Sequence, residues 1–99
     1  MYHYKASILT NEELYQRYID TNDPRILSVI IENNLKGIWR TAMHYAKSFS
    51  NVNYEDMLQE AALGYYEGLK RYDPTRNVKV NSYCTVWAKK YVMDYLNTH

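Results

Sequence analysis

Hydrophobic residues recur at spacings of three and four along most of this chain, as in helices that bury one side. No segment shows the strict alternation of a half-buried strand. A first helix begins after Thr10, because Thr10 and Glu13 stand at the spacing of a capping box. Its expected buried residues are Leu14, Tyr18 and Ile19.

The next helix begins at Asp23-Pro24, with the aspartate as N-cap and the proline in the first turn. Its helical period continues as far as Phe49. Asn33, Asn34 and Gly37 are weak helix formers, so we expect a bend or break near Asn33. The expected buried residues are Ile26, Leu27, Ile30, Ile31, Leu35, Ile38, Trp39, Ala42, Ala46 and Phe49.

A third helix runs from about residue 54 to Tyr72. It ends at Asp73-Pro74, because proline lacks the N–H that a helix needs and its ring restricts the residue before it. The expected buried residues are Met57, Leu58, Ala61, Ala62, Tyr65, Leu69 and Tyr72.

A loop from Thr75 to Val80 precedes a fourth helix, which is capped by Asn81 or Ser82 and runs to about Tyr95. Its expected buried residues are Cys84, Trp87, Ala88, Tyr91, Val92 and Tyr95. The pattern therefore predicts an all-α fold, a compact bundle of about four helices. We expect residues 1–8 to be a flexible N-terminal segment and residues 9–99 to form one domain.

Composition favours a small cytoplasmic domain. The chain has 99 residues and one cysteine, so no internal disulfide can form and a reducing compartment is favoured. It has neither an apolar run long enough to span a membrane nor the apolar core of a signal peptide. Residues 1–60 hold six Lys/Arg against eight Asp/Glu, and residues 61–99 hold six against three, giving −2 and +3. This skew favours different partners for the two halves, although skews of this size also arise by chance.

One face of the third helix is not explained by packing. It carries carboxylates together with a leucine and a tyrosine at spacings of three and four: Asp56, Gln59, Glu60, Leu63, Tyr66 and Glu67. An acidic stripe with apolar anchors suits docking onto a basic partner helix. The alternative is that Leu63 and Tyr66 pack beneath the N-terminal segment.

The outward face of the fourth helix combines cations with rings. It carries Tyr83, Val86, Lys89, Lys90 and Met93, and Arg71, Arg76 and Lys79 come just before it. Cations neutralise phosphates, and an exposed ring can stack on an unpaired base. The pattern is typical of a site for single-stranded nucleic acid, with an ordinary lysine-rich helix surface as the alternative.

No catalytic constellation is visible, and we expect no cofactor and no metal. The three histidines, His3, His44 and His99, lie far apart in the sequence, and no glycine-rich phosphate loop occurs. Asp56 and Glu60 form an i,i+4 carboxylate pair, but no histidine or second pair completes a metal site. We therefore expect a protein that is not an enzyme.

Several short motifs occur in a specific order. They are Asn34-Leu35 with Ala46-Lys47, Glu55-Asp56-Met57-Leu58-Gln59-Glu60 with Leu63-Gly64, Tyr72-Asp73-Pro74, and Ser82-Tyr83 with Trp87. In this order and spacing, from about Leu9 to Asn97, the chain resembles region 2 of the bacterial sigma-70 family, the promoter-recognition subunits of RNA polymerase. The resemblance implies the all-α fold of that region and a place in the cytoplasm of a bacterial host, at the nucleoid.

The resemblance also implies roles for individual residues. Asp56, Gln59 and Glu60 match positions that contact a coiled coil on the largest catalytic subunit of core RNA polymerase, and Tyr66 occupies a further contact position. Tyr83 matches an aromatic residue that helps to open and hold the melted -10 element. The residues expected at polymerase are Asp56, Gln59, Glu60, Leu63 and Tyr66. Those expected at promoter DNA are Arg76, Lys79, Tyr83, Val86, Trp87, Lys89, Lys90 and Met93.

The chain departs from the family pattern at DNA-facing positions. Val86 stands where primary sigma factors carry the first of two adjacent tryptophans, and Val78 and Val80 replace aromatic loop residues. Each lost ring removes stacking of about 1–3 kcal/mol per base. Lys90 and Met93 replace side chains that read the upstream edge of the -10 element, which predicts a different preferred sequence.

The favoured function is a sigma-like transcription initiation factor that binds core RNA polymerase and engages the non-template strand of the -10 element. The sequence stops after the fourth helix. That leaves open a fragment of a larger factor, a factor that works with a separate protein for upstream promoter recognition, or a phage or mobile-element regulator. Two alternatives stand beside it. One is a polymerase-binding regulator that occupies the sigma site without reading DNA, and the other is an unrelated helical protein-interaction module.

Overall fold

The chain is built from helices alone in the part that the structure describes. This computed structural model describes residues 9–47, 49 and 51–98. Its elements are α1 (Asn11–Thr21), α2 (Arg25–Asn33), α3 (Leu35–Ala46), α4 (Tyr54–Arg71), the 3₁₀ helix η1 (Pro74–Arg76) and α5 (Val80–Thr98). The all-α prediction is confirmed for these residues, with one helix more than expected because the second splits in two. The predicted flexible segment, residues 1–8, lies outside the described residues.

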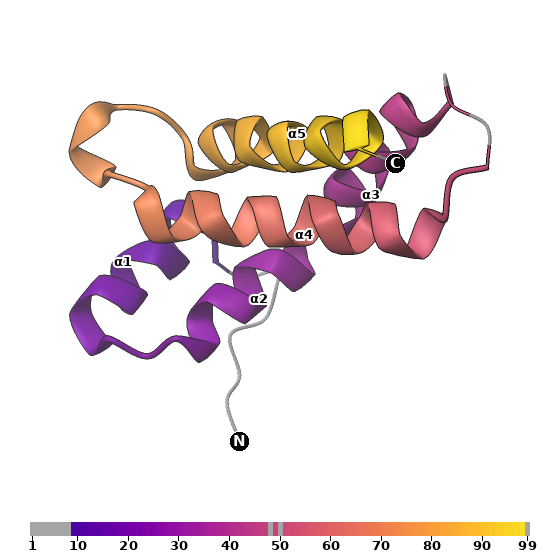
Figure 1. Ribbon diagram of the computed structural model, residues 1–99. Coiled ribbons are helices and arrows are strands. Elements are labelled where there is room, and N and C mark those ends of the chain that lie inside the picture. Colours follow the sequence, from indigo (N-terminus) through magenta and orange to yellow (C-terminus); the bar gives the residue numbers. More distant parts are fainter. Residues whose placement is uncertain (1–8, 48, 50, 99) are drawn as a thin grey trace.

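Helices α4 and α5 lie side by side and antiparallel, joined by the loop that contains η1 (Figure 1). Helix α2 packs against α4, while α1 packs against α2 and also contacts the start of α5, and α3 contacts both α4 and α5 (Figure 1). Gly64 and Gly68 of α4 face Ala88 and Cys84 of α5. Small residues on both sides of this seam let the two helices approach closely, which fixes the surfaces on either side of it.

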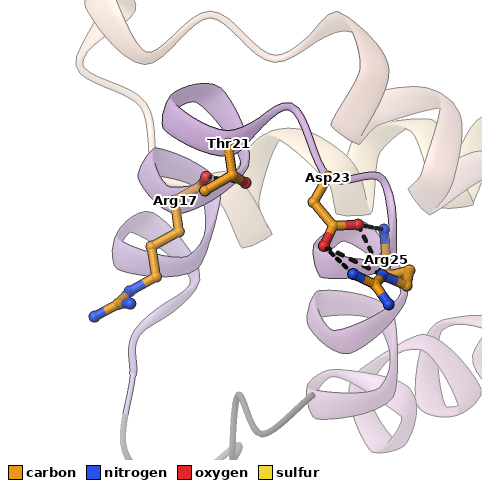
Figure 2. A network of polar contacts seen from close by, with 4 residues as sticks. All are labelled: Arg17, Thr21, Asp23 and Arg25. Carbon is orange, nitrogen blue, oxygen red and sulfur yellow. Dashed lines mark hydrogen bonds and ion pairs between the residues drawn. The ribbon is translucent and has the colours of Figure 1, made fainter. Parts of the chain in front are cut away.

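The first turn of α1 follows the predicted capping, and Asp23 orders the link to α2. Thr10 Oγ1 accepts the backbone N–H of Glu13 at 3.0 Å and the Glu13 carboxylate accepts the backbone N–H of Thr10 at 2.9 Å, which confirms the capping box. The Asp23 carboxylate accepts the backbone N–H of Arg25 at 3.0 Å and pairs with its guanidinium at 2.8 Å (Figure 2). The structure places Pro24 rather than Asp23 at the N-cap, so the predicted start is one residue too early, although the Asp23 carboxylate still accepts the N–H of the first helical residue.

The predicted break falls at Asn34, between α2 and α3. The Asn34 side chain donates to the Ile30 carbonyl at 2.6 Å and to the Asn11 Oδ1 at 2.9 Å. It thus satisfies a free carbonyl near the end of α2 while it ties the break to the start of α1. Two separate helices with different directions follow, rather than one continuous amphipathic helix.

The predicted core differs from the observed core on several helices, and the break accounts for the differences in α3. Four expected core residues are exposed: Ile19, Leu35, Trp39 and Phe49. Four buried hydrophobic residues lie outside the predicted core: Tyr15, Val29, Val80 and Leu96. The buried residues of α3 are Ile38, Ala42 and Ala46, spaced by four, so the core stripe passes beside Trp39 without including it.

Helix α5 begins at Val80, earlier than predicted. The Val80 backbone N–H donates to the Glu12 carboxylate at 2.8 Å, so the cap comes from α1 rather than from Asn81 or Ser82. Val80, expected in the loop, is completely buried. The loop before α5 is therefore held against α1 at its end.

Across residues 9–47, 49 and 51–98, no helix is both long and apolar enough to cross a bilayer.

Candidate functional site

The outer side of α4 carries the residues expected to dock onto polymerase. Asn53 caps the helix by accepting the Asp56 N–H at 3.1 Å, which fixes the start of this face. Leu63 is 53% exposed and Tyr66 is 37% exposed. The set that we call the docking face comprises exposed Asp56, Gln59, Leu63 and Tyr66 and half-buried Glu60.

The acidic end of the docking face lies against the C-terminal half of α5. The Tyr95 hydroxyl donates to the Asp56 carboxylate at 3.3 Å. Burial, followed by the charge of Asp56, raises the pKa of Tyr95 above its ordinary value, so its hydroxyl stays protonated and able to donate. Glu60 shares a shallow hollow with Tyr91, Asp94 and Tyr95. The negative charge of the docking face therefore continues onto α5.

At its C-terminal end, the docking face is bounded by Glu67. Its carboxylate pairs with Lys70 at 3.2 Å and with Arg71 at 2.6 Å. Hydrogen bonds from Arg71 and then Lys70 lower the pKa of Glu67, so it stays ionised and paired. Lys70 also lies 5.1 Å from the centroid of the Tyr66 ring. Glu67 is thus engaged within the chain, and Tyr66 is the last residue of the face that a partner can approach.

Arg71, the last residue of α4, connects the docking helix to α5. Its guanidinium lies 4.9 Å from the centroid of the Trp87 ring, and Glu67 raises its pKa through a hydrogen bond and a favourable charge. The sequence pattern places Arg71 among the cations before the fourth helix, outside the predicted site. Its spacing of four from Glu67 was the signal, because that spacing predicts a held rather than a freely moving side chain.

The loop between α4 and α5 is ordered by Asp73. The Asp73 carboxylate accepts the Thr75 backbone N–H at 2.9 Å and the Thr75 hydroxyl at 2.7 Å. These bonds lower the pKa of Asp73, and Arg76 lies 3.6 Å from the same carboxylate. Asn77 then turns the chain with a left-handed backbone, φ 54°. Arg76 and Lys79 are consequently displayed on a short, braced loop.

A hollow of about 470 Å³ opens beside this loop. The rings of Tyr72 and Tyr83 stand 5.9 Å apart, centroid to centroid, and the Tyr72 hydroxyl donates to the Val78 carbonyl. The two rings line the hollow together with Arg71, Asp73, Arg76 and Val78. We call this space the loop hollow; it combines flat rings, two cations and one carboxylate.

The predicted DNA face of α5 is only partly exposed. Val86 is 63% exposed, and Lys89 and Lys90 are exposed beside it, with Lys90 paired to Asp94 at 3.2 Å. Tyr83 and Met93, expected to point outward, are half-buried and pack against the core. The difference arises because the buried stripe of α5 follows every fourth residue, from Val80 to Leu96, and drifts around the helix.

The residues expected at DNA therefore fall into two neighbouring groups. Arg76 and Tyr83 line the loop hollow, and Lys79 lies on the adjoining loop. Val86, Lys89 and Lys90 lie further along α5, and Trp87 is half-buried beneath Arg71. Lys89 also lines a separate groove with residues of α3, among them Trp39, which sequence reasoning assigned to the core.

The family model described as Sigma-70 region 2 matches residues 30–99. The chain is 27% identical over 95 residues to the RNA polymerase sigma factor RpoH of Zymomonas mobilis, covering 93% of this chain and 31% of the relative. It is 27% identical over 74 residues to the RNA polymerase sigma factor RpoS of Coxiella burnetii, covering 75% and 20%. It is 33% identical over 61 residues to an RNA polymerase sigma-B factor of a Nostoc species, covering 62% and 18%.

No solved structure matches the chain significantly. The chain spans less than a third of the length of these three relatives, at 31%, 20% and 18%. The match of the family model covers all of α3, α4 and α5, which are the helices that carry both candidate surfaces. This chain belongs to the sigma-70 region 2 family.

Proposed function

We propose that this chain acts as a sigma-like transcription initiation factor that binds core RNA polymerase and engages the promoter -10 element. The observation that carries the proposal is the docking face on α4. Four of its five residues are exposed, on a side of the helix that the core does not use, in a chain of the sigma-70 region 2 family. The chain would act in the bacterial cytoplasm at the nucleoid, and it would direct the catalysis of polymerase without a catalytic step of its own.

Docking uses the two chemistries of the face. Leu63 and Tyr66 provide apolar anchors that lose water when a partner helix covers them, and such anchors supply most of the energy of an interface. Asp56, Gln59 and Glu60 provide acidic and polar groups that steer a basic partner and fix its register. The proposed partner segment is the coiled coil of the largest catalytic subunit.

Promoter contact uses the loop hollow and the outer face of α5. The Tyr83 ring at the hollow can stack on an unpaired base of the non-template strand, while Arg71, Arg76 and Asp73 offer donors and an acceptor to its edge. Lys79, Lys89 and Lys90 lie on either side and can neutralise the phosphates of the same strand. Recognition of the upstream promoter element would come from another domain or a separate protein.

A second function is favoured by one specific feature. Val86 is 63% exposed and Val78 is 43% exposed, so two positions at the proposed DNA surface offer no ring for stacking. A chain with a complete docking face and a weakened DNA face suits a regulator that occupies the sigma site of polymerase without reading DNA. The two functions share the docking step and differ in every step that follows.

The docking step is tested by charge reversal. The double variant Asp56→Lys, Glu60→Lys should lose at least about tenfold in capture of purified bacterial core polymerase, because like charges then oppose a basic partner. The matched control is Asp20→Lys, Glu32→Lys, which makes the same charge change at exposed positions of α1 and α2. Equal capture by both folded variants would refute the docking step.

The DNA step is tested with variants of the loop. Arg76→Ala with Lys79→Ala should leave polymerase capture unchanged and lower the yield of transcription from promoters that the wild-type chain supports. If transcription is unchanged while the docking variant abolishes it, the DNA step is wrong and the regulator without DNA contact is the better function. If neither variant alters polymerase capture or transcription, both functions fail.

A further inference from the structure

A groove between α3 and α5 lies apart from the docking face and the loop hollow. Trp39, Arg40 and His44 of α3 line it together with Lys47, just after α3, and Lys89 of α5. Its volume is about 560 Å³. We call it the α3–α5 groove; its size is that of pockets that hold drug-sized molecules.

The positive charge of the α3–α5 groove is not compensated. Among the residues that the structure describes, no carboxylate lines it. Within the described part of the chain, no carboxylate pairs with Arg40, Lys47 or Lys89, whereas Lys70, Arg71, Arg76 and Lys90 each have one within 4.0 Å. The groove therefore has a positive electrostatic potential that attracts an anionic partner.

Trp39 gives the groove a flat ring that the core does not use. It is 51% exposed, although a tryptophan usually buries most of its large apolar surface. The buried stripe of α3 is complete without it, since Ile38, Ala42 and Ala46 face the core. An exposed indole beside three cations is the combination that binds unpaired bases, with the ring stacking and the cations holding the backbone.

We propose that the α3–α5 groove binds single-stranded nucleic acid, with Trp39 stacking on an unpaired base and Arg40, Lys47 and Lys89 neutralising the adjacent phosphates. The proposal rests on the proposed function. Lys89 belongs to both the groove and the outer face of α5, so one strand can pass from Tyr83 along α5 and across onto α3. Trp39 then supplies, from a neighbouring helix, a stacking ring that Val86 does not.

The test measures how the complex of this chain with core polymerase binds a fluorescent single-stranded oligonucleotide of mixed sequence, and the same backbone with abasic sites. Trp39→Ala should weaken binding of the intact strand at least about fivefold, the low end of base stacking on an aromatic ring. Trp39→Phe should restore most of that loss, and neither variant should change binding of the abasic strand.

Lys47→Ala should weaken binding of both strands by a similar factor and reduce the salt dependence by about 0.7 in the log–log slope, the value for one lost contact to a single strand. Tyr54→Ala is the matched control, because Tyr54 is an exposed aromatic, 61% exposed, at the start of α4 and outside the groove. It should bind both strands as the wild-type chain does.

Two results would overturn this inference and leave the proposed function intact. In the first, the wild-type complex binds the intact strand and Trp39→Ala binds it equally well. In the second, Trp39→Ala weakens both strands equally, which would assign the groove to an anionic partner without bases, such as an acidic peptide. A wild-type complex that does not form, or that binds neither strand, overturns the proposed function and this inference together.

Discussion

The backbone of Gly64 lies directly against the backbone of Ala88. A Cβ atom added to Gly64 would stand 2.8 Å from the Ala88 Cα and would collide with the carbonyl oxygen of Trp87. The contact joins the middle of α4 to the middle of α5, where no side chain can act as a spacer. Leu63 of the docking face and Trp87 flank it, so this contact sets the distance between the polymerase-facing and DNA-facing surfaces.

Substituting this glycine should therefore cost stability although alanine is the better helix former. Gly64→Ala should lower the free energy of unfolding by about 1–3 kcal/mol, the range for an overpacked core, because neither backbone segment can move away cheaply. Urea or thermal denaturation measures the difference.

Gly37→Ala serves as the matched control for Gly64→Ala. A Cβ at Gly37 would have no atom within 4 Å, so this variant should gain about 0.5–1 kcal/mol from helix propensity. Equal effects of the two substitutions would show that the close approach of α4 and α5 carries no energetic weight.

Tyr15 joins α1 to the end of α4 and should be sensitive to loss of its hydroxyl. The hydroxyl donates to the Leu69 carbonyl at 3.1 Å and lies 3.2 Å from the Tyr72 carbonyl, and the side chain is 4% exposed. Tyr15→Phe leaves these carbonyls without that donor and should cost about 1 kcal/mol in denaturation experiments. Tyr18→Phe, at a half-buried ring on the same helix, should cost less, and the reverse order would contradict this contact.

The helices could be predicted where their ends are local features. Thr10 with Glu13, Asp23 with Pro24, and Asp73 with Pro74 each determine a helix end through residues within three positions of one another. The start of α5 could not be predicted in this way, because the cap on Val80 comes from Glu12, far away in the sequence. The burial of Tyr15 was missed for the same reason, since its partners lie on α4 and at Tyr72, just after it.

The candidate surfaces also differ in whether they depend on local features or on contacts between separate helices. The docking face follows from the period of one helix, so Asp56, Gln59, Leu63 and Tyr66 could be placed together from spacing alone. The loop hollow and the α3–α5 groove depend on how separate helices cross. Trp39 is exposed because the core stripe is interrupted at Asn34 and resumes with Ile38. The periodicity of the sequence instead predicts one stripe of buried residues that continues through Trp39.

Stability should fall as the solution becomes acidic. Hydrogen bonds lower the pKa values of four carboxylates. The hydrogen-bond partners are Thr10 for Glu13, Arg25 for Asp23, Arg71 for Glu67 and Thr75 for Asp73. A carboxylate whose pKa is lower in the folded chain stabilises it above the unfolded pKa, about 4, and that contribution is lost as pH falls through the folded value. The melting temperature should therefore be constant near neutral pH and drop below about pH 4.

Glu13→Gln isolates one of these groups. Glutamine preserves the capping box with Thr10 but cannot titrate, so the variant should lose less stability than the wild-type chain between about pH 5 and pH 3. Thermal melts at the two pH values make the comparison. A variant with the same acid dependence as the wild-type chain would show that Glu13 does not contribute to the acid sensitivity.

The thiol of Cys84 should resist alkylation in the folded chain. Cys84 is completely buried at the seam of α4 and α5, and a Cβ on Gly68 would lie 3.1 Å from its sulfur. Burial raises its pKa to about 12. Because the thiolate is the reactive form, iodoacetamide near pH 8 should label native Cys84 orders of magnitude more slowly than Cys84 in denaturant. The native rate should rise in Gly64→Ala, since overpacking opens the seam more often, and rapid labelling of the native wild-type chain would show that α4 and α5 are not closely packed.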